Sequence, residues 1–381
     1  MKIINKKIKV ATIIGTRPEI IRLSSTIKRI DQYLDQLIIH TGQNYDYELN
    51  EVFFNDLGLR KPDYFLNVNT SSLGNVLGGI LIRTEEVLKK ECPDAVLILG
   101  DTNSSIAGII AKRLRIPIFH MEAGNRSFDM NVPEEINRRI IDHIADFNLV
   151  YTEHARRHLL SEGLPHRRIY LTGSPINEVL DDHKEKINDS NILEKHNLKK
   201  NLYFIVSIHR EENVDNRDHL EQILSVLNSL AAHYNLPIVV STHPRTKKRL
   251  EILKENQIDD RIQFLKPFGF FDYIKLQKES ICAISDSGTI SEESAILSFP
   301  AISLRQSMER PEAQDTGTII LTGFDPEIIL NSINTVIEEK ELGNYQEIPF
   351  EYQIKNTSWR VLKLIMGNAK LSNKWWGINE S

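Results

Sequence analysis

Short apolar runs rich in β-branched residues alternate with longer amphipathic segments along the chain, and this alternation limits the possible folds more than any other feature. Some runs, such as Ala-Val-Leu-Ile-Leu at residues 95–99, have no polar member and so fit strands that are buried on both faces of a sheet. Such strands, each followed by a helix, are typical of parallel sheets covered by helices. The sequence therefore predicts an α/β protein with doubly wound sheets.

The two halves of the chain repeat this pattern. In the first half we expect strands near residues 8–14, 36–40, 95–99, 116–119, 148–151 and 169–171, and helices near 18–31, 73–90, 104–114, 134–144 and 154–162. In the second half we expect strands near 203–208, 237–241, 262–264, 282–285, 301–303 and 318–321, and helices near 217–233, 245–255, 271–278, 290–297 and 325–339.

The length of 381 residues is about twice that of one compact domain, so we expect two. The predicted first domain spans residues 1–175 and the second spans 176–355, with the crossover in or just before the polar stretch 181–200. A C-terminal helical segment, about 356–381, is expected to pack back on the first domain. Within it, Trp375-Trp376 is either an anchor or part of a frayed tail.

Composition excludes several classes of protein. Hydrophobic residues make up 41% and charged residues 26%, which is typical of a folded globular chain. The formal net charge of −5 provides no global positive field for nucleic acid or an anionic membrane. The two cysteines, Cys92 and Cys282, fit no disulfide framework or metal-ligand spacing and favour a reducing cytoplasm. We read the N-terminus as a first strand and not as a signal peptide.

Polar motifs follow nearly every predicted strand, where ligands of open parallel sheets bind. These motifs start at Gly15, Thr41, Gly100, His120, Gly173, Ser207, Ser241 and Ser285. The Gly-rich dinucleotide fingerprint, the P-loop and the common zinc motifs are absent from the sequence. We therefore expect no cofactor and no metal.

Two of these motifs fit anion binding at a helix start. After Gly15, Pro18 suits the first helical turn, and Arg17 with Arg22 can face an anion; the alternative is a cap with solvated arginines. After Ser285, the small residues Asp286-Ser-Gly-Thr let a pyrophosphate approach backbone amides. Glu292 and Glu293 then either grip ribose hydroxyls or only complement the helix dipole.

Carboxylates and histidines at the strand ends supply candidates for proton transfer. Asp101, Glu122 and Glu134 all follow strands of the first half, and three acids at one edge are costly unless cations or catalysis explain them. Arg126 and Arg138 can supply the cations, so a purely structural ion-pair network stays open. His209 is a candidate phosphate or proton-transfer partner, and His243 is a weaker one.

With these motifs in the order found, the chain resembles the non-hydrolysing UDP-N-acetylglucosamine 2-epimerase family. The resemblance spans about residues 10–321 and rests on Gly15-Thr-Arg-Pro-Glu, Thr41-Gly-Gln, Gly100-Asp-Thr, Glu122-Ala-Gly, Pro133-Glu-Glu-x-Asn-Arg138, Thr172-Gly, His209-Arg, Thr242-His-Pro and Asp286-Ser-Gly-x-x-x-Glu-Glu293. It implies two Rossmann-like domains in the glycosyltransferase-B architecture, a homodimer, and no metal. It further implies UDP binding by Arg17, His209, Ser287, Gly288 and Glu293, and acid/base roles for Asp101, Glu122 and Glu134.

Some residues differ from the common epimerase pattern: Arg22, Asn125, Glu211 and Thr289. With Phe128-Asp129 and Glu309-Arg-Pro-Glu312, they resemble the subfamily that converts UDP-N-acetyl-L-talosamine-type sugars to UDP-N-acetyl-L-fucosamine for surface polysaccharides. We count Arg22, Arg138 and Thr289 with the substrate-binding residues and His209 with the catalytic ones. Gln43 matches the family motif for regulation by UDP-N-acetylglucosamine.

The resemblance implies a route by elimination. The proton on carbon 2 of a 2-acetamido sugar is not acidic, so a carboxylate must remove it while UDP leaves carbon 1, and a glycal forms. Protonation on the opposite face and re-addition of UDP complete the inversion, in a cleft that two hinged domains can close. The alternatives are a UDP-sugar glycosyltransferase of the same fold, a silent sugar-nucleotide sensor and a hydrolysing epimerase.

Overall fold

The structure is a computed structural model that describes residues 7–43, 53–208, 216–242, 258–306, 309–343 and 347–378. It divides into a first unit, Met1–Asp182 with Gln353–Ser381, and a second unit, His183–Tyr352. The predicted domain boundary at 175/176 lies before helix α7 (Ile176–Asp182), which packs against helix α1 (Arg17–Tyr33) of the first unit. We describe each unit by itself.

The first unit is built on a seven-stranded parallel sheet with the order β3-β2-β1-β4-β5-β6-β7. The strands are β1 (Lys9–Ile14), β2 (Asp35–His40), β3 (Tyr64–Phe65), β4 (Ala95–Leu99), β5 (Ile118–Met121), β6 (Phe147–Val150) and β7 (Ile169–Leu171). All but β3 are predicted by the sequence to within two residues, and β3 is too short for a periodic signal.

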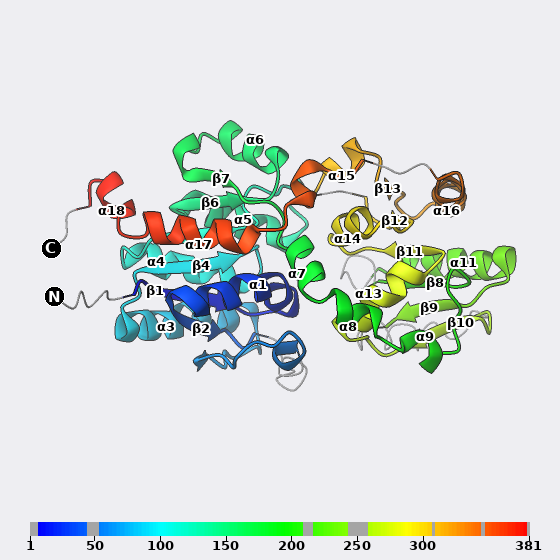
Figure 1. The fold of residues 1–381 in the computed structure, drawn as a ribbon, viewed down its shortest axis with the longest axis horizontal. Helices are drawn as coiled ribbons and strands as arrows, with labels where there is room; N and C mark the ends of the chain where they lie inside the picture. Colours follow the sequence, from blue (N-terminus) through cyan, green and yellow to red (C-terminus); the bar gives the residue numbers. More distant parts are fainter. Residues whose placement is uncertain are drawn as a thin grey trace. The chain divides into compact units, whose positions relative to one another are not determined.

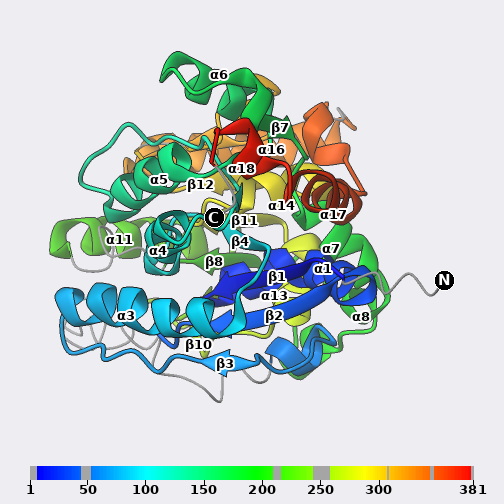
Figure 2. The ribbon, with the colours of Figure 1, turned by 90° about the vertical axis from the view of Figure 1, so that its left-hand side faces the viewer.

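Helices cover both faces of this sheet, so its strands are buried (Figure 2). Helices α3 (Leu73–Glu91), α4 (Ala107–Arg113) and α5 (Pro133–Ile144) lie on one side, and α1 and α17 (Thr357–Asn368) lie on the other. The unit also contains α6 (Glu153–Ser161) and the short 3-10 helices η1 (Asn103–Ile106) and η2 (His166–Arg168). Apolar side chains of β1, β4, α3 and α4 share one continuous core.

The C-terminal segment is fastened to the first unit. Helix α17 packs along α1, and the Arg29 guanidinium lies 4.2 Å from the centre of the Trp359 ring. Helix α18 (Ser372–Trp375) follows, and the Trp376 indole donates a 2.6 Å hydrogen bond to Asp146 while Arg168 stacks 4.1 Å from its ring centre. The tryptophan pair therefore anchors the chain and is not a frayed tail.

The second unit contains a six-stranded parallel sheet with the order β10-β9-β8-β11-β12-β13 (Figure 1). Its strands are β8 (Phe204–Ser207), β9 (Ile238–Ser241), β10 (Ile262–Leu265), β11 (Cys282–Ser285), β12 (Ala301–Ser303) and β13 (Ile320–Leu321). Its helices are α8 (Lys184–Asn188), α9 (Ile192–Lys195), α11 (Arg217–Tyr234), α13 (Phe270–Glu279), α14 (Ile290–Leu297), α15 (Glu312–Asp315) and α16 (Pro326–Glu341), with the 3-10 helix η3 (Phe350–Gln353) at its end. The helix predicted near 245–255 lies outside the described residues.

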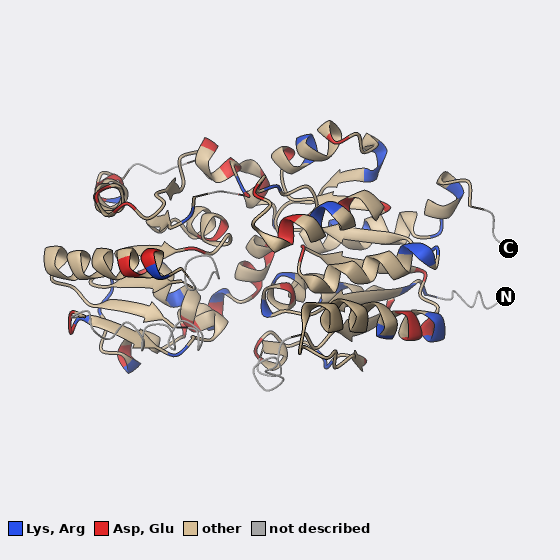
Figure 3. Cartoon of the chain, turned by 180° about the vertical axis from the view of Figure 1, so that it is seen from behind, with Lys and Arg blue, Asp and Glu red and all other residues tan. Residues whose placement is uncertain are grey.

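Charged residues are spread over the helices and loops of both units, whereas the strands are almost free of them (Figure 3). This distribution follows from the burial of the strands, because an unpaired charge in a sheet core is costly. Among the described helices, none is long and apolar enough to cross a membrane.

Candidate functional site

Helix α1 begins at the carboxyl end of β1. The buried carboxylate of Glu19 connects its first turn to the loop that follows the neighbouring strand β4 by hydrogen bonds. Glu19 accepts hydrogen bonds from the backbone N–H groups of Gly15 (2.5 Å) and Thr16 (2.9 Å). Its other oxygen accepts from the hydroxyls of Thr102 (2.5 Å) and Ser104 (2.7 Å), which follow β4. Burial raises the pKa of Glu19, and these hydrogen bonds oppose the increase.

Sequence reasoning did not identify Glu19 as a site residue. The sequence nevertheless indicated where the Glu19 carboxylate lies, because Thr16-Arg-Pro-Glu19 has the spacing of a capping box. In a capping box, the glutamate three residues after the cap accepts a hydrogen bond from the cap N–H. Next to it, the Gln43 side chain donates to the Thr102 hydroxyl at 3.2 Å. The regulatory role of Gln43 stays a prediction.

Arg17 is a partly buried cation at the start of α1. Its guanidinium lies 4.4 Å from the centre of the Phe53 ring, and burial lowers the pKa of this arginine. In the described part of the chain no carboxylate forms an ion pair with it. A desolvated cation without a counter-ion, beside the positive end of a helix, is suited to bind an anion.

Asp101 and Glu122 follow neighbouring strands, because Leu99 of β4 pairs with Met121 of β5. Asp101 accepts a 2.9 Å hydrogen bond from Nε of Arg138. Glu122 accepts a 2.5 Å hydrogen bond from Arg22. The two carboxylates are thus held at one edge of the sheet by separate guanidinium groups, which offsets their mutual repulsion.

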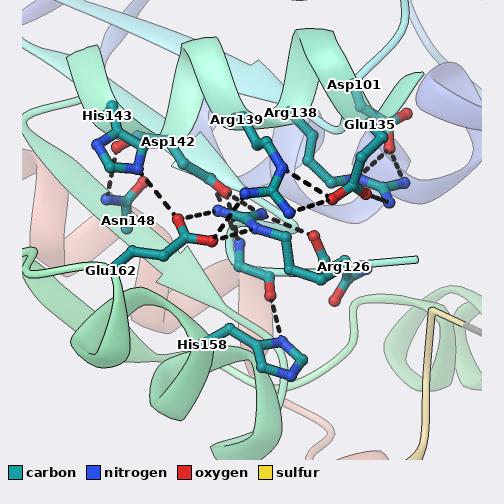
Figure 4. A network of polar contacts seen from close by, with 12 residues as sticks. Asp101, Arg126, Glu135, Arg138, Arg139, Asp142, His143, Asn148, His158 and Glu162 are labelled. Carbon is teal, nitrogen blue, oxygen red and sulfur yellow. Dashed lines mark hydrogen bonds and ion pairs between the residues drawn. The ribbon is translucent and has the colours of Figure 1, made fainter. Parts of the chain in front are cut away.

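The structure shows which partners the predicted cations have. Arg22, expected to face an anionic ligand, contacts Glu122 of its own unit, and its role in substrate binding stays a prediction. Arg126, expected beside the predicted acids, instead pairs with Asp142 and Glu162 (Figure 4). The reason is that the Arg126 side chain turns into the protein, where it is 1% exposed.

The two glutamates that open α5 differ. Glu135 is buried, and it accepts a hydrogen bond from the backbone N–H of Ser127. It also accepts from Arg138 and Arg139 (Figure 4). Glu134, the predicted acid/base residue, is exposed in the first turn of the helix. Its acid/base role stays a prediction, whereas Glu135 is a structural residue that sequence reasoning did not distinguish.

In the second unit, the loop after β11 is lined by small polar residues. Ser287 donates its backbone N–H to the Ser285 hydroxyl at 3.0 Å, and its own hydroxyl lies 3.0 Å from that of Thr289, which precedes α14. Glu293 accepts a 2.9 Å hydrogen bond from Gln277. The proposed ligand-binding roles of Ser287, Gly288, Thr289 and Glu293 stay predictions.

Two arginines lie against this loop: Arg305, which sequence reasoning missed, and Arg310, which it noted only as part of the subfamily segment Glu309-Arg-Pro-Glu312. A Cβ atom at Gly288 would lie 2.8 Å from Nη1 of Arg310 and 3.4 Å from Nη1 of Arg305, so only glycine lets these guanidinium groups approach the backbone so closely. Arg310 also contacts Glu292, which is fully buried. His209 and His243 lie outside the described residues.

Comparison with known proteins identifies the family. A family profile described as UDP-N-acetylglucosamine 2-epimerase matches residues 28–366. The chain belongs to this family. Its fold is therefore the two-domain α/β type of these isomerases, the glycosyltransferase-B type.

Three relatives are similar over nearly their whole length. A UDP-N-acetylglucosamine 2-epimerase structure from Rickettsia bellii is 47% identical with a TM-score of 0.90, covering 97% of this chain and 100% of that one. The Methanocaldococcus jannaschii epimerase in complex with UDP-GlcNAc and UDP is 34% identical with a TM-score of 0.88, covering 95% and 100%. A UDP-2,3-diacetamido-2,3-dideoxy-D-glucuronate 2-epimerase from Pseudomonas aeruginosa is 33% identical over 86% of this chain and 92% of its own.

Proposed function

We propose that this epimerase-family chain inverts carbon 2 of a UDP-2-acetamido sugar by eliminating UDP to a glycal and adding it back. Membership of the family supports the reaction type, and the bound UDP-GlcNAc and UDP of the M. jannaschii relative support the ligand class. The loop at Ser287 and Gly288 is proposed to bind UDP, and the strand ends of the first unit are proposed to act on the sugar.

The observation that carries the proposal is the combination at the edge of the first sheet. Among the described residues Arg17, at a helix start, has no carboxylate partner, and the carboxylates of Asp101 and Glu122 follow adjacent strands, each in contact with an arginine. The cation can stabilise the negative charge of the departing diphosphate. The two carboxylates can transfer the proton at carbon 2.

The proposed reaction has two steps, an elimination and a return step. A carboxylate takes the proton from carbon 2, the C–H electron pair becomes the new double bond between carbons 1 and 2, and UDP leaves with the electrons of the C1–O bond. In the return step a carboxylic acid protonates carbon 2 on the opposite face while UDP attacks carbon 1. No redox step occurs, so the reaction requires no electron acceptor.

For the sugar itself, we propose a 2-acetamido-2,6-dideoxy hexose, with UDP-N-acetyl-L-talosamine converted to UDP-N-acetyl-L-fucosamine for surface polysaccharide. Asn125 and Thr289, which differ from the common epimerase pattern, support this choice. The P. aeruginosa relative acts by name on another sugar, so family membership does not restrict the chain to UDP-GlcNAc. We further propose a cytoplasmic homodimer.

The test is an exchange experiment in deuterated water. The protein is incubated with UDP-GlcNAc and, separately, with the UDP-6-deoxy-2-acetamido sugars, and the products are followed by NMR. We expect deuterium at carbon 2 with inversion, and the highest kcat/KM with the 6-deoxy substrate. With oxygen-18 in the C1–O bridge, the label should scramble into the diphosphate. Inversion without scrambling would disprove elimination, and an absence of deuterium with every sugar would disprove epimerisation.

Two variants test the carboxylates in the same assay. Glu122→Gln and Asp101→Asn are each expected to lower the exchange rate by about 10²-fold or more, because general acid/base catalysis contributes about 10²–10⁴-fold. UDP affinity should stay within a few-fold of the wild type. A variant with near-wild-type exchange would remove that residue from the acid/base pair.

A further inference from the structure

A buried histidine–aspartate pair lies behind the two carboxylate-bearing turns of the first unit. His120 is the third residue of β5 and is 1% exposed, and Asp142 is on α5 and is 0% exposed. Nδ1 of His120 and Oδ1 of Asp142 are 2.9 Å apart. Polar groups this deeply buried are retained only where their hydrogen bonds are made.

On one side, His120 contacts the turn that carries Asp101. Its Nε2 lies 2.8 Å from the carbonyl oxygen of Gly100. A carbonyl oxygen only accepts hydrogen bonds, so Nε2 carries the proton and donates it. This bond fixes the peptide unit that joins Gly100 to Asp101, at a glycine with a left-handed φ of 73°.

On the other side, Asp142 contacts the turn that carries Glu122. It accepts from the backbone N–H of Gly124 at 3.1 Å. It also accepts from Nη1 of Arg126 at 2.7 Å (Figure 4). Glu122 itself has a φ of 64°, in the left-handed region that costs a residue with a side chain about 1–3 kcal/mol. Such a conformation persists only where neighbouring contacts hold it, and Asp142 supplies two of them.

Helix α5 contacts the turn of Asp101 in two ways, through Arg138 and through Asp142. Arg138, one helical turn before Asp142, binds the Asp101 side chain (Figure 4). Asp142 contacts His120, which in turn donates to the Gly100 carbonyl. The same helix therefore determines where both carboxylates lie relative to each other.

We propose that His120 and Asp142 are positioning residues for the epimerisation, which hold the turns of Asp101 and Glu122 in a fixed relation to carbon 2 of the sugar. The inference rests on the proposed function. Proton removal and return on opposite faces require two groups placed correctly at once, and a displacement of about 1 Å can reduce a rate by about 10²-fold.

Asp146 provides a matched control. It is also a buried aspartate of the first unit, 2% exposed, and it also accepts from a β5 backbone group, the N–H of Ile118 at 2.9 Å, and from a cation, Lys112 at 2.7 Å. It differs in position, because Ile118 begins β5 whereas Gly124 follows the end of that strand. If the loss of buried hydrogen bonds were the only effect, substitution of either aspartate should therefore change kcat to the same extent.

The experiment compares Asp142→Asn with Asp146→Asn. For each, carbon-2 deuterium exchange, UDP affinity by calorimetry and urea unfolding are measured under conditions where the variant is folded. We expect Asp142→Asn to lose about 10²-fold in kcat, with UDP affinity within about threefold, and Asp146→Asn to keep its kcat within about threefold. Equal losses of kcat in both, or an unchanged kcat in Asp142→Asn, would overturn the proposal.

Two histidine variants decide the matter if Asp142→Asn does not fold. The amide of Gln can reach the place of Nε2 and donate to Gly100, whereas that of Asn reaches only the place of Nδ1. His120→Gln should therefore keep at least about tenfold more activity than His120→Asn at similar UDP affinity. The reverse order, or equal activity, would contradict the positioning role.

A separate measurement distinguishes failure of this inference from failure of the proposed function. If the wild type exchanges no hydrogen at carbon 2, the proposed function fails, and nitrogen-15 NMR of the imidazole still tests the pair. We expect a protonated Nε2 on His120 in the wild type, and a changed Nδ1 signal in Asp142→Asn but not in Asp146→Asn. An unprotonated Nε2 would exclude the bond to Gly100 on which the inference depends.

Discussion

At the scale of single residues, the site is defined by which charges have partners. Asp101 and Glu122 each have an arginine, whereas Arg17 has only the face of Phe53 among the described residues. Charge-assisted hydrogen bonds to phosphate are worth about 1.5–3 kcal/mol, which corresponds to about 10–100-fold in affinity. Arg17 is therefore the residue whose loss should affect nucleotide binding most directly.

Arg17→Ala is expected to weaken UDP binding by about 10–100-fold, measured by titration calorimetry. Arg29→Ala is the matched control, since Arg29 lies on the same helix but stacks on Trp359 of the C-terminal segment. Its UDP affinity should change less than twofold. Unchanged affinity in Arg17→Ala would remove this residue from the phosphate site.

At the scale of elements, the C-terminal helices complete the first unit. Helix α17 lies on α1, and α18 brings Trp376 to Asp146 and Arg168, residues more than 200 positions away in sequence. These contacts lie on residues next to β6 and β7, on the side where the strands begin, whereas the candidate site follows the ends of β1, β4 and β5. We therefore expect substitutions in the C-terminal helices to change the stability of the first unit without changing catalysis.

Trp376→Ala is expected to lower the free energy of unfolding by about 2 kcal/mol, because it removes a partly buried hydrogen bond to Asp146 and a cation–π contact with Arg168. Trp376→Phe keeps the aromatic face for Arg168 and should lose about half as much. Urea unfolding measures both, and kcat should not change in either. A loss of kcat without a loss of stability would show that the anchor acts on the site.

At the scale of the whole molecule, His40 makes the stability of the first unit depend on pH. Burial lowers the pKa of His40 to about 4. The neutral ring accepts a 3.0 Å hydrogen bond from the N–H of Gly42 at Nδ1 and stacks on Phe65 at 4.7 Å. Below pH 6.5 the unfolded chain binds a proton here that the folded unit does not, so stability falls as the pH falls to about 4.

The expected loss from His40 between pH 6.5 and pH 4 is about 3 kcal/mol. His40→Phe keeps the stacking and cannot titrate, so its free energy of unfolding should fall less than that of the wild type over this range. His166→Gln, which alters an exposed histidine of the same unit, should follow the wild type. Parallel pH curves for His40→Phe and the wild type would show that His40 is not the group responsible.

By itself the sequence determined every strand except β3, most of the helices and the edge of each sheet at which the polar motifs lie. The reason is local: a fully apolar run flanked by small polar residues specifies a buried strand and its end without reference to any distant residue. Only the tertiary structure decided which acidic side chain pairs with which arginine. Arg22 reaches Glu122 across 100 positions, and Arg126 turns inward to Asp142, because these pairings depend on how helices pack across the sheet, and no periodicity in the chain encodes that packing.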